Sequence, residues 1–83
     1  MKVNVYVTLK PGVLDAPGQA VTLSLTRLGF AEAREVRLGK YLELELDAPG
    51  KTPAEIHARV ENMCRELLAN VVLEDFRIEL KEV

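Results

Sequence analysis

The stretch "EVRLGKYLELELDAPG" (Glu35–Gly50) decides the fold, because leucines and glutamates alternate strictly within it over Leu42–Leu46. Alternation with period two predicts a β-strand that buries its leucines on one face and presents its acids on the other. Val36–Leu38 predicts a short strand just before it, joined through Gly39–Lys40 as a tight turn. A bulge in one long bent strand is the alternative interpretation of the same residues.

Two further strands and two helices surround this stretch. Val3–Leu9 and Phe76–Leu80 alternate in the same way, which predicts a strand near each end of the chain. Apolar residues at helical spacing predict one helix over about Pro17–Leu28 and a second that starts at Thr52–Glu55 and ends at Asn70. The second helix begins with a threonine, a proline and a glutamate at the spacing of a capping box, so its start is clearly marked.

The resulting order, βαββαβ, predicts an α+β fold in one domain over residues 1–83. Two helices with one apolar face each can cover only one side of a sheet. We therefore expect a ferredoxin-like βαββαβ sandwich, with a four-stranded antiparallel sheet and both helices on one face. The inward side chains would be Val3, Val5, Val7, Leu9, Val36, Leu38, Leu42, Leu44, Leu46, Phe76, Ile78 and Leu80. The open face would present Asn4, Tyr6, Thr8, Tyr41, Glu43, Glu45, Arg77 and Glu79.

A chain of 83 residues has a small core, and surface scaling predicts burial of roughly 60–65% of its unfolded surface. Chains of this size usually need a disulfide, a metal or a partner subunit. The single cysteine excludes an internal disulfide and, with a single histidine, cannot build a zinc site. Oligomerisation is therefore the stabilising device that we expect. The first residues alternate polar with apolar, unlike a signal peptide, and no apolar run is long enough for a bilayer, so we expect a cytoplasmic protein without a membrane partner.

Nucleic-acid binding and catalysis are both disfavoured by the residues themselves. A net charge of −2 and two acids on the open face give no attraction for phosphate. An acylphosphatase-like site would need an arginine in loop 10–18 and an asparagine on strand 41–46, and neither is present. His57 falls on the polar side of its helix and Cys64 on the core stripe, so we expect neither to act as a catalyst.

Amino-acid sensing is the alternative function that stays open. The stretch "KPGVLDAPGQAV" (Lys10–Val21) is similar to the ligand-binding turn of ACT regulatory domains, in which glycine lets the backbone approach an amino acid. A tight loop explains the same residues. An ACT-like module usually accompanies a catalytic domain, and these 83 residues contain none.

A protein partner is the function that the open face favours most. Tyrosine is enriched at interfaces because it combines contact area with a polar tip. If the first and third predicted strands are neighbours, the two tyrosines of the open face lie close together within a charged rim. The candidates for a homodimer interface are Tyr6, Tyr41, Glu43 and Arg77.

Three stretches carry a resemblance to a known family. They are "VYVTLKPGVLDAPGQAV" (Val5–Val21), "VRLGKYLELEL" (Val36–Leu46) and "CRELLANVVLEDFRIEL" (Cys64–Leu80). Together they resemble the PurS family, the small subunit of formylglycinamide ribonucleotide amidotransferase (phosphoribosylformylglycinamidine synthase). The departures from the family pattern are small: Ala16-Pro17 in the loop, and Val72-Leu73 and Phe76 near the last strand.

The resemblance implies an adaptor role in the fourth step of purine biosynthesis. In this family a glutaminase subunit releases ammonia, and a large synthetase subunit uses Mg-ATP to amidate formylglycinamide ribonucleotide. The small subunit is a homodimer that helps to join the two, and pairs of dimers could form tetramers. For this chain the resemblance implies no catalytic, cofactor-binding or metal-binding residue, with glutamine and Mg-ATP used by the rest of the complex.

The residues that match the family pattern are the candidates for contacts with the larger subunits: Lys10, Gly12, Asp15, Arg37, Gly39, Lys40, Asn70, Glu74 and Asp75. We expect Gly12, Gly18 and Gly39 to serve positive φ angles or close approach. The aspartate at the start of the first helix suits an N-cap, and the asparagine suits the left-handed position after the second. The three cations would meet acids of a partner. The last two acids would meet its basic residues or protect the strand edge against aggregation.

Overall fold

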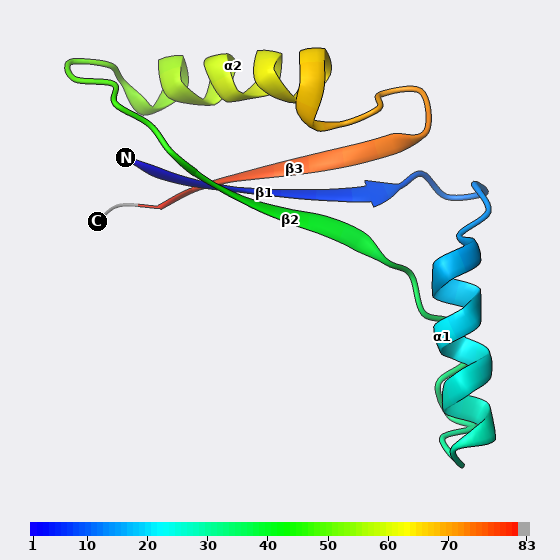
Figure 1. Ribbon diagram of the computed structural model, residues 1–83. Coiled ribbons are helices and arrows are strands. Elements are labelled where there is room, and N and C mark those ends of the chain that lie inside the picture. The colour runs from blue at the N-terminus through cyan, green and yellow to red at the C-terminus, as the bar shows by residue number, and fades with distance from the viewer. Residues whose placement is uncertain (82–83) are drawn as a thin grey trace.

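A computed structural model describes residues 1–81 of the chain (Figure 1). Its elements follow the order β1 (Lys2–Leu9), α1 (Ala16–Arg27), β2 (Gly39–Glu45), α2 (Pro53–Met63), a short π-helical segment η1 (Cys64–Leu68) and β3 (Glu74–Lys81). The α+β class and all three long predicted strands are confirmed, and both helices form close to their predicted bounds.

The sheet has three antiparallel strands in the order β2-β1-β3, with β1 in the centre. The prediction of a fourth strand at residues 36–38 is wrong. This segment runs beside α1 instead, where the backbone N–H of Val36 donates to the Thr22 hydroxyl at 3.0 Å. The predicted tight turn at Gly39–Lys40 is also wrong, because both residues already belong to β2 and pair with β1. The chain therefore enters β2 directly from an extended segment.

α2 covers the apolar face of the sheet and forms the core (Figure 1). Its N-cap is Thr52, whose hydroxyl accepts the N–H of Glu55 at 3.2 Å, as the capping-box spacing predicts. The stripe of Ile56, Val60 and Cys64 is buried against the three valines of β1. Burial of one helical stripe against alternate strand residues is the main source of stability in this half of the molecule.

α1 does not pack on the sheet, so the prediction of two helices on one face is wrong (Figure 1). It projects from one end of the sheet, and its only buried residue is Gly18. The radius of gyration is 16.3 Å, whereas a compact chain of this length would have one of about 12 Å. Polar contacts of the loops that flank α1 hold this outward position, as described below.

The outward position of α1 changes the predicted core. Val36 and Leu38 are not core residues, and Leu38 is exposed. Leu42, Leu44 and Leu46 do face α2, but they remain only half-buried. The β2 half of the apolar face therefore has no complete cover within a single copy of the chain.

The end of the second helix also differs from the prediction. No residue other than glycine has a positive φ among residues 1–81, so Asn70 does not take the left-handed position. The helix ends instead in η1, where the N–H of Ala69 donates to the carbonyl of Cys64 at 2.9 Å. Asn70 organises the following turn: its side-chain oxygen accepts the N–H of Val72 at 3.1 Å.

Candidate functional site

Three segments, each a loop with or without the first residues of the strand that follows it, meet at one end of the sheet, and we call them the loop cluster: residues 10–15, 37–40 and 70–75. They meet because β1 ends where its antiparallel neighbours β2 and β3 begin. All nine residues predicted to contact larger subunits lie in this cluster, although the sequence scatters them over 66 positions. The sequence found these residues, and the sheet topology brings them together.

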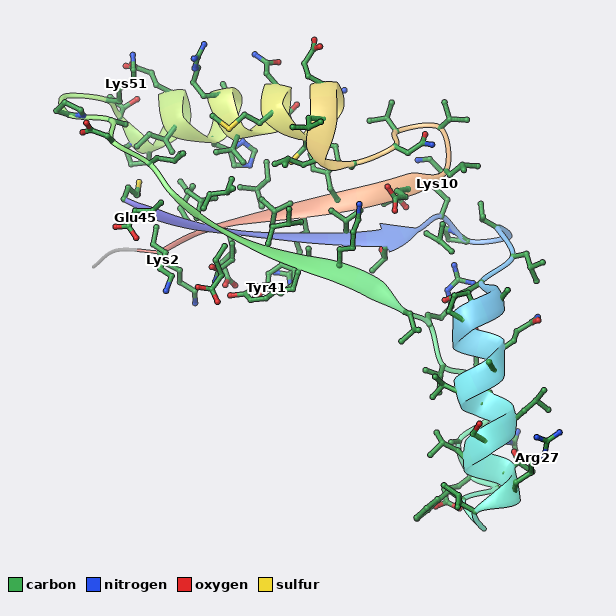
Figure 2. All side chains as sticks on the ribbon, viewed as in Figure 1. Lys2, Lys10, Arg27, Tyr41, Glu45 and Lys51 are labelled. Carbon is green, nitrogen blue, oxygen red and sulfur yellow. The ribbon has the colours of Figure 1, made fainter. Side chains whose placement is uncertain are left out.

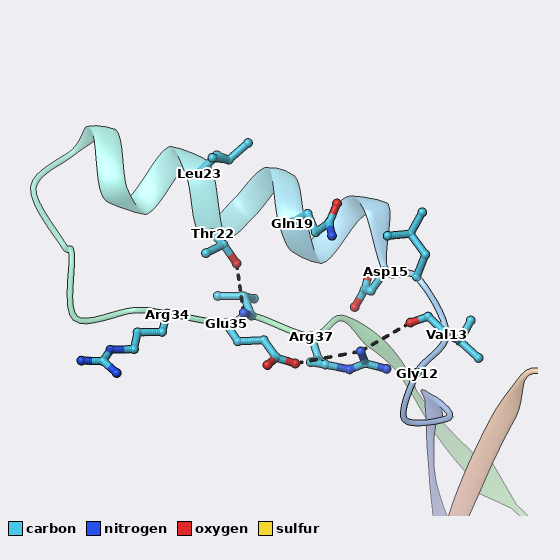
Figure 3. A pocket seen from close by; sticks show the side chains of 11 residues that line it. Gly12, Val13, Asp15, Gln19, Thr22, Leu23, Arg34, Glu35 and Arg37 are labelled. Carbon is cyan, nitrogen blue, oxygen red and sulfur yellow. Dashed lines mark hydrogen bonds and ion pairs between the residues drawn. The ribbon is translucent and has the colours of Figure 1, made fainter.

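Arg37 ties the cluster to the end of β1. Its guanidinium donates to the carbonyls of Leu9 and Lys10, both at 3.1 Å. A third, longer contact of 3.5 Å reaches the carbonyl of Val13 (Figure 3). The planar fork of arginine suits this task because it presents several donors in fixed directions. Arg37 thus satisfies carbonyls of its own chain, which the sequence did not reveal.

Asp15 is the N-cap of α1, as predicted. Its carboxylate accepts the N–H of Gly18 at 2.9 Å, and its second oxygen accepts the N–H of Leu38 at 2.7 Å. These two hydrogen bonds, that from Gly18 first, hold the pKa of the Asp15 carboxyl below its ordinary value. Asp15 is 6% exposed and joins the start of α1 to the segment before β2, and its contact with a partner subunit stays a prediction.

The remaining charged residues of the cluster also have partners within the chain. Lys10 forms an ion pair with Asp75 at 2.6 Å, and Lys40 donates to the carbonyl of Leu68 at 3.4 Å. Glu74 accepts the N–H of Asn70 at 2.7 Å. The Lys10 and Asp75 side chains are nevertheless about half exposed, so their contact with a partner subunit stays a prediction.

Two glycines of the cluster region serve close approach, as expected. A Cβ atom on Gly18 would lie 2.3 Å from the carbonyl oxygen of Val36, and one on Gly39 would lie 2.4 Å from that of Val7. Neither glycine has a positive φ, whereas Gly12 does, at +88°. The backbone of α1 therefore touches the returning segment through Gly18.

A hollow of about 590 Å³ lies between α1 and residues 34–37 (Figure 3). It is lined by Gly12, Val13, Leu14, Asp15, Gln19, Thr22, Leu23, Arg34, Glu35, Val36 and Arg37. Asp15 and Arg37 already form hydrogen bonds with backbone groups of their own chain.

Exposed apolar residues of the cluster are a feature that the sequence interpretation missed. Leu14 is 69% exposed, and the turn before β3 exposes Val71, Val72 and Leu73, with Val72 at 77%. A solvated turn normally consists of polar residues, and neighbouring exposed apolar residues mark an interaction surface. The signal was present in the sequence as three successive apolar residues between a helix and a strand.

The open face of the sheet has the composition that the sequence predicted (Figure 2). Tyr6 pairs directly with Tyr41, and their ring centroids lie 5.0 Å apart. The guanidinium of Arg77 lies 4.2 Å from the Tyr6 ring centroid, and Lys2 forms an ion pair with Glu43 at 3.1 Å. Desolvation, followed by the nearby Glu43 carboxylate, raises the pKa of Tyr41.

One buried polar atom on this face has no partner in the described chain. The Asn4 side chain is buried, and its amide nitrogen reaches Glu79 at 3.4 Å, but its Oδ1 accepts no hydrogen bond. Unsatisfied buried acceptors are rare in folded proteins, because leaving one unpaired costs free energy. Hydrogen bonding at the centre of the open face is therefore incomplete within the described chain.

The two candidate catalytic side chains lack a catalytic environment. Cys64 is fully buried, and burial raises the pKa of its thiol, which disfavours the nucleophilic thiolate. His57 lies on the exposed side of α2, 3.6 Å from Glu61. Residues 1–81 contain no group of three or more metal-ligating side chains. No helix in this part of the chain is long and apolar enough to cross a membrane.

Comparison with known proteins assigns the family. The family model described as PurS, phosphoribosylformylglycinamidine (FGAM) synthase, matches residues 2–82. The chain belongs to the PurS family. It is 45% identical to phosphoribosylformylglycinamidine synthase subunit PurS of Bacillus subtilis, over 99% of this chain and 94% of that one. The resemblance drawn from three sequence stretches is thus confirmed, and the ACT-like alternative finds no support in these matches.

Solved structures share the whole fold. PurS of Methanocaldococcus jannaschii, described as a subunit of formylglycinamide ribonucleotide amidotransferase in the purine biosynthetic pathway, is 32% identical with a TM-score of 0.87, over 99% of this chain and 96% of that one. A chain in the structure of PurLQS from Thermotoga maritima is 27% identical with a TM-score of 0.83, over 94% and 93%. Such scores over nearly the whole chain require that the outward position of α1 be shared, because α1 and its flanking loops make up about a third of the residues.

Proposed function

We propose that this chain, as the PurS subunit of FGAM synthase, is a non-catalytic adaptor in purine biosynthesis. It forms a homodimer that bridges the glutaminase subunit and the large synthetase subunit, so that ammonia passes between them without loss to water. The complex consumes glutamine and Mg-ATP, and this chain holds neither. It works in the cytoplasm.

The loop cluster is the observation that carries this proposal. It gathers the family-matching residues at one end of the sheet and surrounds them with exposed apolar side chains. Its polar groups are engaged within the chain, which gives a preformed surface rather than an open reactive site. A preformed apolar surface with a charged surround suits binding of another protein. The match to a chain of PurLQS supports a place in a multi-subunit assembly.

The open face is the proposed surface for self-association. Tyr6 and Tyr41 supply a small aromatic centre, and Glu43 and Arg77 supply a charged rim. The unpaired oxygen of Asn4 supports this assignment, because a second copy could bring a donor to it. The loop cluster is then left for the larger subunits.

Reconstitution tests the adaptor role. The chain is mixed with the glutaminase and the synthetase, and glutamine-dependent amidation is compared with ammonia-dependent amidation. Omission of the chain is expected to abolish the glutamine-dependent activity and largely spare the ammonia-dependent one. Equal use of glutamine with and without the chain would contradict the proposal.

A surface variant tests the loop cluster in the same assay. Val72→Glu places a charge on a side chain that is largely exposed, so the fold should persist while docking of the larger subunits weakens. The matched control is Ala58→Glu on the exposed side of α2. Glutamine-dependent activity should fall for the first variant and stay unchanged for the second.

A further inference from the structure

We propose that two copies of this chain meet through their open faces with the strands antiparallel, about a two-fold axis that crosses β1 between Asn4 and Tyr6. The inference rests on the proposed homodimer and gives it a register, in which named side chains of one copy meet named side chains of the other. It does not depend on the role of the pair in ammonia transfer.

The strand register arranges the open face in rows that cross the sheet. Each row has one residue from β2, one from β1 and one from β3, because both outer strands pair directly with β1. The two middle rows are Glu43-Asn4-Glu79 and Tyr41-Tyr6-Arg77. The first of these rows supplies two carboxylates and an amide oxygen, which are acceptors. The second supplies two hydroxyl groups and a guanidinium, which are donors.

A two-fold axis between these two rows makes the open face complementary to itself. The axis lies parallel to the sheet and perpendicular to its strands, so each middle row of one copy faces the other middle row of the second copy. Sheets that pack face to face keep their strands within about 30° of each other, about 10 Å apart, so opposing side chains interdigitate. Glu79 then faces Arg77 of the second copy, and Glu43 faces its Tyr41. Each contact joins an acceptor to a donor and occurs twice in the pair.

The buried acceptor of Asn4 is the observation that points to a missing donor. Asn4 is 6% exposed, and its Oδ1 accepts no hydrogen bond within residues 1–81. In the proposed register Asn4 faces Tyr6 of the second copy, whose hydroxyl has only a long contact of 3.4 Å, with Glu79, in its own chain. The hydroxyl reaches Asn4 once the neighbouring Lys2–Glu43 ion pair turns aside, which costs little because both side chains are about half exposed. The pair thus satisfies an acceptor that a single copy leaves unpaired.

Charge disfavours the alternative arrangement, in which the strands of the two copies are parallel. A two-fold axis along β1 would place Glu79 opposite Glu43 of the second copy, twice, in a row that holds no cation. Like charges that face each other across an interface destabilise it. The antiparallel arrangement instead places Lys81 opposite Asp75 of the second copy, at the solvated rim. An exposed ion pair adds little affinity, so this contact supports the register and contributes little to the strength of association.

Charge reversal followed by mixing tests the register by sedimentation equilibrium on the full chain. Arg77→Glu places acids opposite each other across the pair, and Glu79→Arg places cations opposite each other. Each variant alone should raise the dissociation constant of the pair by about tenfold or more. An equimolar mixture should return the constant to within about threefold of that of the unaltered chain, because both contacts across a mixed pair again join an acid to a cation. The control Lys51→Glu makes the same charge change outside the open face and should leave the constant unchanged.

Restoration on mixing reports only the contact between copies. The Arg77–Glu79 contact within one chain, 3.7 Å long, is lost in both variants and stays lost in their mixture. Far-UV circular dichroism checks that each variant is folded. If one is not, Tyr6→Phe replaces it: this variant keeps the ring, removes the donor to Asn4 and should raise the dissociation constant about fivefold.

Three results would overturn the register. They are weaker association without restoration on mixing, association that neither reversal changes, and variants that lower glutamine-dependent activity while sedimentation stays unchanged, which would assign the open face to a larger subunit. Loss of glutamine transfer in a mixture that associates normally would overturn only the adaptor role.

Discussion

The carboxylate of Asp15 accepts the backbone N–H of Leu38 at 2.7 Å, and this hydrogen bond joins the start of α1 to the segment that leads into β2. The same side chain caps α1 through Gly18. One residue thus sets both the start of the helix and the path of the returning chain. Its position holds α1 away from the sheet, which leaves the apolar side chains of the helix exposed and the β2 half of the sheet only partly covered.

The Asp15 carboxylate should make stability depend on pH in the acid range. Its pKa is lower in the folded chain than in the unfolded one, because two backbone N–H groups bond to the charged form. Its stabilising contribution is therefore complete above the unfolded pKa of about 3.9 and is lost as the pH falls through the lower folded value. Asp15→Asn should lower the thermal midpoint of unfolding at pH 6. The gap in midpoint between the variant and the unaltered chain should narrow as the pH falls below about 3.9. A gap that is constant from pH 6 to pH 2.5 would contradict this role.

Gly18→Ala should destabilise the chain even though alanine favours helices by about 1 kcal/mol. The added Cβ would meet the carbonyl oxygen of Val36 at 2.3 Å, so the arm must open. We expect a net loss of roughly 1–3 kcal/mol in the free energy of unfolding, measured with urea. Ser24→Ala, at an exposed position of the same helix, is the control and should change stability by less than about 0.5 kcal/mol. A stabilising Gly18→Ala would show that the arm is not packed as described.

Cys64 should be inert in the folded protein. Its thiol is fully buried, and its pKa is raised by that burial. Alkylation at pH 8 should be slower by on the order of a hundredfold or more than in urea-unfolded chain, because the reaction must wait for local opening. Rapid labelling of the native chain, followed by mass spectrometry, would instead reveal an accessible thiol and reopen the question of its function.

Tyr6→Ala/Tyr41→Ala tests the open face. In the proposed homodimer this face lies between the two copies, with the Tyr6 and Tyr41 rings at its centre. The double change should weaken self-association of the chain about tenfold in sedimentation experiments, as expected for loss of an aromatic interface centre. Lys81→Ala, on the charged margin of the same sheet, is the control and should have little effect. Unchanged association of the tyrosine variant would show that the open face serves no contact between copies.

The sequence predicted the strands and helices wherever local patterns decide them. Alternation in Leu42–Leu46 and the capping box at Thr52–Glu55 each gave the correct element. Adjacency of the first and third predicted strands also gave the Tyr6–Tyr41 pair correctly. The errors concern three features. The segment around Val36 and Leu38 has two apolar residues that fit an edge strand or an extended return beside α1 equally well, α1 does not pack on the sheet, and Asn70 does not take the left-handed position.

The sequence by itself determined the family, the sheet that α2 covers and the residues of the loop cluster, because these follow from side-chain periodicity, caps and turn residues that act over a few positions. Only the tertiary structure decided that α1 stands apart from the sheet. That choice depends on hydrogen bonds that Asp15 and Thr22 accept from backbone N–H groups and that Arg37 donates to a backbone carbonyl, over separations of 14 to 28 positions, for which periodicity carries no signal. The same bonds decide which apolar surfaces remain uncovered within a single copy of the chain.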